Sequence, residues 1–235
     1  ARNAMLTPTT SVMYASAVGA PGVLSTTLRG LAEGGTLTGG QVAKLGQIVN
    51  ERRSILVFGD RATGKSTLLN ALFELVPVDE RFVAIQRRPD LPALKERSFC
   101  VRLAVDDDTD VAALFGKARR MQPGRLVVGE LQWDEMRHLF TLLVEMPTVG
   151  AMATLRADNV HKAVDTLVKA VGGGDPTSGR AVVAAVRPVL AHMHSDEKGL
   201  PRLAALWSVG GLGGEELQLE ELRTKAPAAR LVAEA

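Results

Sequence analysis

Residues 54–67 read Ser-Ile-Leu-Val-Phe-Gly-Asp-Arg-Ala-Thr-Gly-Lys-Ser-Thr, and Leu-Leu-Asn-Ala-Leu follows at 68–72. The apolar run at 55–58 has the composition of a strand, and the segment after Gly64 has that of a helix. Between them lies Gly-x-x-x-x-Gly-Lys-Ser, so strand, loop and helix come in the order of a phosphate-binding P-loop. This context makes chance the weaker interpretation of the pattern, and it predicts a site for a nucleoside triphosphate.

The loop residues indicate how the phosphates of a nucleoside triphosphate would be held. Glycines at 59 and 64 allow backbone conformations and close approaches that a Cβ atom would block. Successive N–H groups can then point inward at the start of a helix and bind an anion. We expect Lys65 to reach the β- and γ-phosphates and the Ser66 hydroxyl to bind Mg²⁺. The predicted nucleotide-binding residues are Gly59, Asp60, Arg61, Ala62, Thr63, Gly64, Lys65, Ser66 and Thr67.

A second acidic element is expected at the end of a buried strand near the P-loop. In P-loop enzymes such a carboxylate holds Mg²⁺ or positions the attacking water. Residues 125–130, Arg-Leu-Val-Val-Gly-Glu, read as a buried strand that ends in a carboxylate. We therefore predict Glu130 as a catalytic and metal-site residue. The alternative is a surface glutamate that merely ends a strand.

Strands alternate with helices through the first two-thirds of the chain, which favours an α/β fold with a mainly parallel sheet flanked by helices on both faces. Thr38 is predicted to cap a helix, and the acidic run 106–110 suits a helix start, as a solvated cap rather than a metal site. Later strands at 189–193, 204–209 and 216–219 predict a small antiparallel C-terminal unit. We expect three segments: the remnant of a tag with an irregular arm (1–22), one P-loop domain (23–222) and a flexible tail (223–235).

Composition narrows the partners and the compartment. The 28 Lys and Arg residues nearly balance 26 Asp and Glu, so the net charge of +2 gives no electrostatic signal of nucleic-acid binding. The single cysteine, Cys100, excludes an internal disulfide and a structural zinc site of paired cysteines, which indicates a reducing compartment. It lies in an apolar run, so we expect a buried, inert thiol. No apolar run approaches the roughly 20 residues that a helix needs to span a bilayer. We expect a cytoplasmic protein.

Together with the P-loop, four other stretches resemble the type II/IV secretion, pilus-assembly (tight-adherence) and conjugation ATPases. They are 35–49 before the P-loop, 78–85 (Val-Asp-Glu-Arg-Phe-Val-Ala-Ile), 120–130 (Arg-Met-Gln-Pro-Gly-Arg-Leu-Val-Val-Gly-Glu) and 150–158 (Gly-Ala-Met-Ala-Thr-Leu-Arg-Ala-Asp). They occur in the family's order. The separate domain that family members carry ahead of this core has no counterpart in these 235 residues.

The resemblance carries expectations about fold and assembly. It implies a RecA-like ATPase core that binds ATP or ADP together with Mg²⁺. It implies a homo-oligomer, as a hexameric ring, or a mixed ring, with nucleotide between neighbouring subunits. It also implies partners among inner-membrane secretion or pilus platform proteins, and hence a peripheral position at the cytoplasmic face of that membrane. Trp133, Met136 and Phe140 can form part of a ring contact, although their helical spacing also suits core packing.

Several positions depart from the family's catalytic boxes. Gln86-Arg87 stands where the family has Glu-Asp, and Arg156 stands where it has histidine. The family has an Arg-Met-Arg pattern, of which only the first arginine, Arg120, remains here. The family also has an arginine after Val-Arg-Leu, but here that place falls near Asp106, which weakens the case for a trans-acting arginine finger. By their match with the family, the candidate catalytic residues are Lys65, Gln86, Arg120, Glu130 and Arg156.

These replacements predict a nucleotide site with weak or absent hydrolysis. Gln86 can orient a water but cannot take its proton, and losing a general base lowers the rate about 10²- to 10⁴-fold. Losing an arginine finger lowers it roughly 10³- to 10⁵-fold. Arg156 can stabilise charge on the γ-phosphate. It can equally pair with Asp158 or Glu130, and both interpretations stay open.

Two functions therefore follow from the sequence. The first is the ATP-binding core of a type II/IV secretion or pilus-assembly ATPase, as a motor or as a degenerate ring subunit. The second is a nucleotide-sensing scaffold that regulates a secretion or pilus assembly without hydrolysis. A P-loop kinase would need an acceptor pocket and a lid, for which the sequence gives no signal.

Overall fold

The computed structural model describes residues 27–87 and 91–224. The predicted arm at 1–22 and nearly all of the predicted tail at 223–235 lie outside these residues. Within them the chain forms one eight-stranded sheet in the order β3-β2-β4-β5-β1-β6-β7-β8. The strands are β1 (Ile55–Gly59), β2 (Phe82–Gln86), β3 (Cys100–Ala104), β4 (Arg125–Glu130), β5 (Gly150–Arg156), β6 (Val189–Ser195), β7 (Pro201–Gly213) and β8 (Glu216–Glu221).

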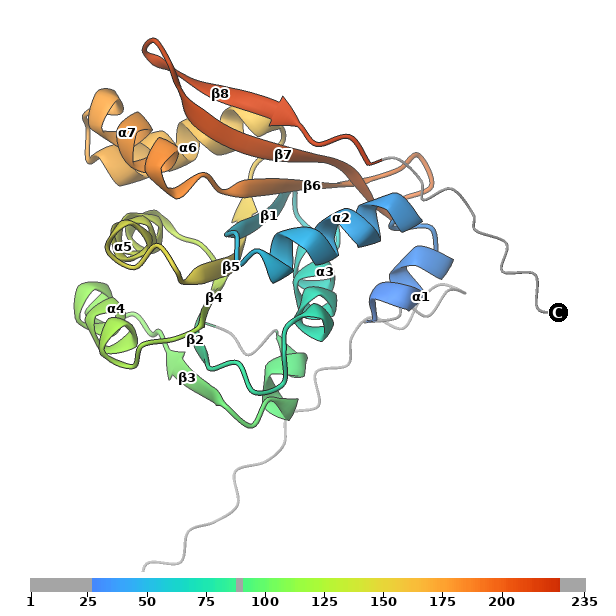
Figure 1. The fold of residues 1–235 in the computed structure, drawn as a ribbon, viewed down its shortest axis with the longest axis horizontal. Coiled ribbons are helices and arrows are strands. Elements are labelled where there is room, and N and C mark those ends of the chain that lie inside the picture. The colour runs from blue at the N-terminus through green and yellow to red at the C-terminus, as the bar shows by residue number, and fades with distance from the viewer. Residues whose placement is uncertain (1–26, 88–90, 225–235) are drawn as a thin grey trace, which may run out of the picture.

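Helices cover both faces of this sheet, as the alternation of elements predicted (Figure 1). On one face lie α1 (Leu28–Glu33), α2 (Gly39–Asn50), α3 (Lys65–Leu72) and the short helices η1 (Phe73–Leu75) and η2 (Pro92–Glu96). On the other lie α4 (Val111–Arg120), α5 (Trp133–Glu145), α6 (Val160–Gly172) and α7 (Pro176–Val186).

The central strands are buried on both sides because successive side chains point to opposite faces. In β1, Leu56 and Phe58 join the core under α4 to α7, whereas Ile55 and Val57 join the core under α1 to α3. None of these four side chains is exposed to solvent. The sheet is thereby fixed rigidly between two apolar layers, and its carboxyl edge forms a stable platform for loops.

Strand order determines what lies next to the P-loop. β1 pairs in parallel with β5 and with β6, and β5 pairs in parallel with β4. Glu130, at the end of β4, therefore lies two strands from the P-loop at the same edge of the sheet. β6 is parallel to β1 on one side and antiparallel to β7 on the other, so the predicted antiparallel C-terminal strands are present and continue the parallel sheet. β8 pairs antiparallel with β7 and extends the same sheet.

Strand β3 forms the far edge of the sheet, where it pairs with β2. Side chains at the start of this strand are open to solvent: Phe99, just before β3, is 57% exposed, and Val101, within it, is 41% exposed. Cys100 is only partly buried, so the expectation of a buried thiol was wrong. An edge strand lacks a neighbour on one side, and apolar composition alone does not place it in the core. Partial burial still raises the pKa of the Cys100 thiol.

Candidate nucleotide-binding site

The P-loop connects the end of β1 to the start of α3. Gly59 lies against the strand β6, where a Cβ atom would come within 2.1 Å of the Met193 carbonyl oxygen. Gly64, which precedes α3, has a left-handed backbone with a φ of 87°. Ala62 also has a positive φ, of 61°. A short loop needs such backbone angles to curl its N–H groups toward one point.

Lys65 lies back across this loop. Its Nζ donates a hydrogen bond to the Asp60 carbonyl oxygen at 2.6 Å, and the Thr63 hydroxyl donates to the same oxygen at 2.9 Å. Burial lowers the pKa of Lys65, while the charges of Glu130 and Asp60 act in the opposite direction. A phosphate oxygen is a stronger acceptor than a carbonyl, because the charge assists the bond. The ammonium group can therefore turn from the loop to a bound phosphate.

A cavity of about 460 Å³ opens beside the loop. It is built from the start of α3 and from the ends of β2, β4 and β5. Four cationic side chains face one carboxylate in its wall, a balance that favours a polyanion. The lining residues are Arg61, Ala62, Lys65, Ser66, Arg87, Gly129, Glu130, Gln132, Thr154 and Arg156.

Glu130 reaches the cavity because the β4–β5 ladder is irregular at this point. The register shifts between Val128 and Glu130, and the Thr154 hydroxyl donates to the Gly129 carbonyl oxygen at 3.1 Å. Thr154 is buried, whereas Glu130 is exposed. The hydroxyl thus fixes the backbone just before the carboxylate and leaves the carboxylate itself accessible.

Arg156, at the end of β5, pairs with neither of the two carboxylates considered from the sequence. Its Nη2 lies 3.4 Å from Oδ1 of Asp60, and Asp158 instead pairs with Lys162 at 2.5 Å. The pKa of Asp60 is lowered, first by the Arg61 backbone N–H and then by Arg156. Arg156 lines the cavity as well, so it lies within reach of an anion there.

Gln86 and Arg87 follow each other at the end of β2 but have different surroundings. Gln86 is half-buried and does not line the cavity. Arg87 does, and its Nε lies 3.1 Å from Oε1 of Glu135. Sequence reasoning did not select this pair. The spacing Gln132-x-x-Glu135 is that of a capping box, and this was the only local signal that Glu135 turns back toward Gln132.

Arg120 is not brought to the cavity within one chain. It ends α4, before the amino end of β4, and thus lies at the opposite edge of the sheet from Glu130. Its neighbour Arg119 pairs at 2.7 Å with Glu145, the last residue of α5. A role for Arg120 in chemistry would therefore require a second subunit.

The three hydrophobic residues of α5 separate into two groups. Met136 and Phe140 are buried in the core, so they cannot contribute to a ring contact. Trp133 is 53% exposed and follows Gln132, which lines the cavity. Only Trp133 remains as a candidate contact residue near the nucleotide site.

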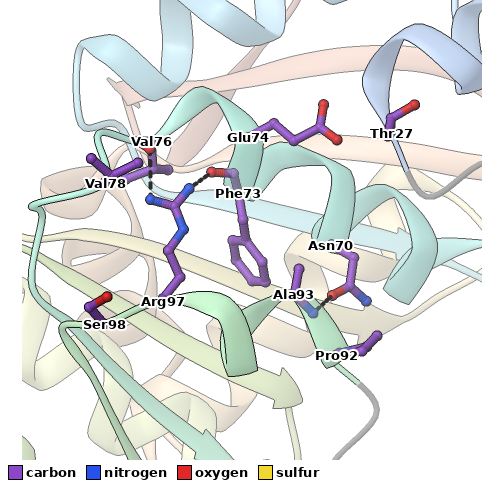
Figure 2. A pocket seen from close by; sticks show the side chains of 10 residues that line it. All are labelled: Thr27, Asn70, Phe73, Glu74, Val76, Val78, Pro92, Ala93, Arg97 and Ser98. Carbon is purple, nitrogen blue, oxygen red and sulfur yellow. Dashed lines mark hydrogen bonds between the residues drawn. The ribbon is translucent and has the colours of Figure 1, made fainter.

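A larger cavity, of about 680 Å³, lies behind α3 and contains none of the predicted site residues (Figure 2). Arg97 crosses it and donates hydrogen bonds to the carbonyl oxygens of Phe73 and Val76. The Asn70 side chain accepts from the Ala93 N–H at 3.2 Å and donates to the Ser66 carbonyl oxygen at 3.0 Å. These bonds connect η1 and η2 to α3. The polar residues that line this cavity therefore hold neighbouring elements together.

The fold is a mainly parallel α/β sheet in which a P-loop joins β1 to α3 and opens onto a cavity lined by cationic side chains. No protein-family model matches the chain. It is 32% identical over 188 residues to the putative conjugal transfer protein Rv3659c of Mycobacterium tuberculosis H37Rv, covering 76% of this chain and 53% of that protein. It is 29% identical over 140 residues to the type IV secretion system protein VirB11 of Bartonella henselae, covering 56% of this chain and 39% of the relative.

Among solved structures, the VirB11 ATPase of Brucella suis, in complex with sulphate, aligns with a TM-score of 0.65 at 22% identity, over 80% of this chain and 64% of that one. The Legionella pneumophila ATPase DotB aligns with a TM-score of 0.52 at 15% identity, over 66% and 46% of the two chains. These likenesses support the fold. By sequence the chain is similar to conjugal transfer and type IV secretion proteins. It spans about half the length of the conjugal transfer protein.

The described residues contain no helix that is long and apolar enough to cross a bilayer.

Proposed function

We propose that this chain is the ATP-binding core of a secretion or pilus-assembly ATPase, and that it hydrolyses ATP slowly or not at all. The observation that carries the proposal is the wall of the P-loop cavity. It contains the loop, Lys65, Ser66 and Glu130, but Arg87 and Arg156 occupy the places where the family has acidic and histidine groups. The groups that would bind phosphate are all present, whereas the positions that activate water in the family carry other residues.

The residues present fit a magnesium–nucleotide complex. The loop amides and Lys65 would bind the phosphates. The Ser66 hydroxyl and the Glu130 carboxylate both line the cavity and offer the oxygen ligands that Mg²⁺ prefers. When bound, the metal would neutralise charge on the β- and γ-phosphates. Glu130 would hold a water through its exposed carboxylate.

Slow hydrolysis follows from the groups around that water. Among the described residues that line the cavity, Glu130 is the only carboxylate. Gln86 supplies an amide, which cannot accept a proton, and it is half-buried beside the cavity. Without a second base the rate should fall by about 10²- to 10⁴-fold. Arg156 can offset part of this loss if it stabilises the transition state.

An assembly of several copies would bring further groups to the site. Arg120 lies at the far edge of the sheet, and Trp133 is exposed beside the cavity. A ring in which nucleotide lies between subunits would let the sheet edge of one subunit face the cavity of the next subunit.

We further propose that residues 23–222 form one ATPase domain. We also propose that the protein lies at the cytoplasmic face of the inner membrane, held there by platform partners.

Binding and turnover measured together test the proposal. Isothermal titration with Mg²⁺-ADP and a non-hydrolysable ATP analogue should show binding that Lys65→Ala abolishes. Lys117→Ala, on the exposed side of α4, is the matched control and should bind as the native protein does. Phosphate release should be near background. Turnover comparable to a working motor, abolished by Lys65→Ala, would contradict the weak-hydrolysis part.

A restoration experiment locates the defect. The double variant Gln86→Glu with Arg156→His returns both positions to the family pattern, and it should release phosphate faster than either single variant. An unchanged rate would mean that the altered boxes do not limit hydrolysis.

The surplus of guanidinium groups in the cavity also favours the second candidate, a scaffold that senses nucleotide without hydrolysis. It predicts nucleotide-dependent association with no turnover, even beside a catalytic partner. If Lys65→Ala left assembly unchanged, this candidate would lose its basis.

A further inference from the structure

Two arginines flank Glu130 at the carboxyl edge of the sheet. β4 lies between β2 and β5, so the residue after β2 and the last residue of β5 lie on either side of the carboxylate. These residues are Arg87 and Arg156, and both line the cavity with Glu130. Arg156 already has an exposed partner in Asp60. Arg87 has a partner of a different kind.

Arg87 forms an ion pair with the buried side chain of Glu135. The Glu135 side chain is only 2% exposed, while that of Arg87 is 38% exposed. One carboxylate oxygen lies 3.1 Å from Arg87 Nε, and the other accepts the backbone N–H of Gln132 at 2.7 Å. A buried carboxylate with both oxygens engaged is a fixed anchor, because its position is set by the helix start as well as by the ion pair.

The anchor uses only one edge of the guanidinium group. Arginine carries five N–H donors in a planar fork, and Glu135 engages the Nε side. In the part of the chain that the structure describes, Arg87 has no other ion pair, and its side chain lies in the cavity wall. The terminal amino groups are thus positioned to bind a planar or tetrahedral oxyanion, which is the typical use of this fork.

We propose that Arg87 binds the terminal phosphate of a nucleoside triphosphate, with Glu135 as its positioning residue, so that the site prefers ATP to ADP. This rests on the proposed function of the cavity as a nucleotide site. The P-loop and Lys65 are shared by both nucleotides. Arg87 enters the cavity beside Glu130, on the side away from β1 and the P-loop, and we assign the third phosphate to that side.

The test compares affinities for two nucleotides. Dissociation constants for a non-hydrolysable ATP analogue and for ADP are measured with Mg²⁺ by isothermal titration. For Arg87→Ala we expect the affinity for the ATP analogue to fall by about tenfold to a hundredfold, the usual effect of a hydrogen bond to a charged group. The affinity for ADP should change by less than about twofold. Arg102→Ala, an exposed arginine on β3, is the matched control and should leave both affinities unchanged.

Glu135→Gln separates positioning from folding. The amide oxygen can still accept the Gln132 N–H, but the charge that orients Arg87 is removed. The ratio of the two affinities should then shift in the same direction as in Arg87→Ala, by a smaller factor. Arg87→Lys should restore part of the preference, because an ammonium group keeps the charge but cannot form both contacts.

Each outcome has a definite meaning. If the native protein binds both nucleotides and the variants leave the ratio of affinities unchanged, or reduce both affinities equally, the role of Arg87 is excluded while the nucleotide site stands. If the native protein binds neither nucleotide, the proposed function and this inference fail together.

Discussion

Arg156 Nη2 lies 3.4 Å from Asp60 Oδ1, so the end of β5 is joined to the P-loop by an ion pair. Both side chains are 64% exposed, and pairs of this kind contribute little to stability. The contact instead affects the charge that an anion would meet in the cavity. Asp60 places a carboxylate beside the proposed phosphate site and also pairs with Arg156, one of the cations that an anion there would use. A bound triphosphate would have to compete with it.

Removing that competition should tighten binding. For Asp60→Asn we expect the affinity for Mg²⁺-ADP or an ATP analogue to rise by about two- to tenfold at low salt, because a nearby negative charge is lost. The gain should shrink at high salt, since exposed charges are screened. Titrations at two ionic strengths measure this. A fall in affinity at both would mean that Asp60 supports the loop instead of opposing the phosphate.

The pKa of Lys65 predicts how binding depends on pH. Burial lowers this pKa from the ordinary value of 10.5, so Lys65 loses its charge at a lower pH than an exposed lysine. The affinity for ADP should therefore decline as the pH rises from 7, and the decline should begin below pH 10.5. In Lys65→Arg the side chain stays charged, and the decline should disappear. An affinity that is constant up to that pH in the native protein would contradict the prediction.

His192 predicts a loss of stability in mild acid. Its ring stacks on Phe58 at 4.6 Å between centroids, and burial, followed by the neighbouring His194, lowers its pKa below 6.5. The folded state then favours the neutral ring, so this contribution is complete above pH 6.5 and is lost as the pH falls through the lowered pKa. Thermal unfolding between pH 7 and pH 5 should show a smaller decline in His192→Gln than in the native protein.

The control for His192 is an exposed histidine on α6. His161→Gln should leave the decline between pH 7 and pH 5 as it is in the native protein. If both variants change the decline equally, the effect does not come from the partly buried ring of His192.

A buried ion pair at the amino end of β4 should be important for stability. The Arg125 side chain is 1% exposed and that of Glu80 is 4% exposed, with 3.3 Å between Nε and Oε1. Glu80→Gln leaves a buried guanidinium group without its counter-charge, which should lower the free energy of unfolding by about 3–5 kcal/mol. Urea unfolding measures the change. Arg119→Ala breaks the exposed pair with Glu145, and it should cost less than about 1 kcal/mol. Equal effects would contradict this account.

Local patterns predicted most of the secondary structure. The side chain of Thr38 accepts the Gln41 N–H before α2, and that of Asp110 accepts the Ala113 N–H before α4, as the capping patterns indicated. Such bonds join residues three apart, so the sequence contains both partners. The exposure of Cys100 was predicted wrongly because burial depends on where a strand lies in the sheet. The parallel pairing of β6 with β1 was missed for the same reason.

The sequence by itself determined the P-loop and the α/β fold, because the motif is a single local turn and hydrophobic alternation follows from the periods of helix and strand. Only the tertiary structure decided which side chains share the cavity. Glu130, Arg87 and Arg156 come from the ends of three different strands, and they meet because β4 lies between β2 and β5. Strand order is set by packing between distant segments. For that reason the Arg87–Glu135 anchor and the Asp60–Arg156 pair could not be inferred from spacing along the chain.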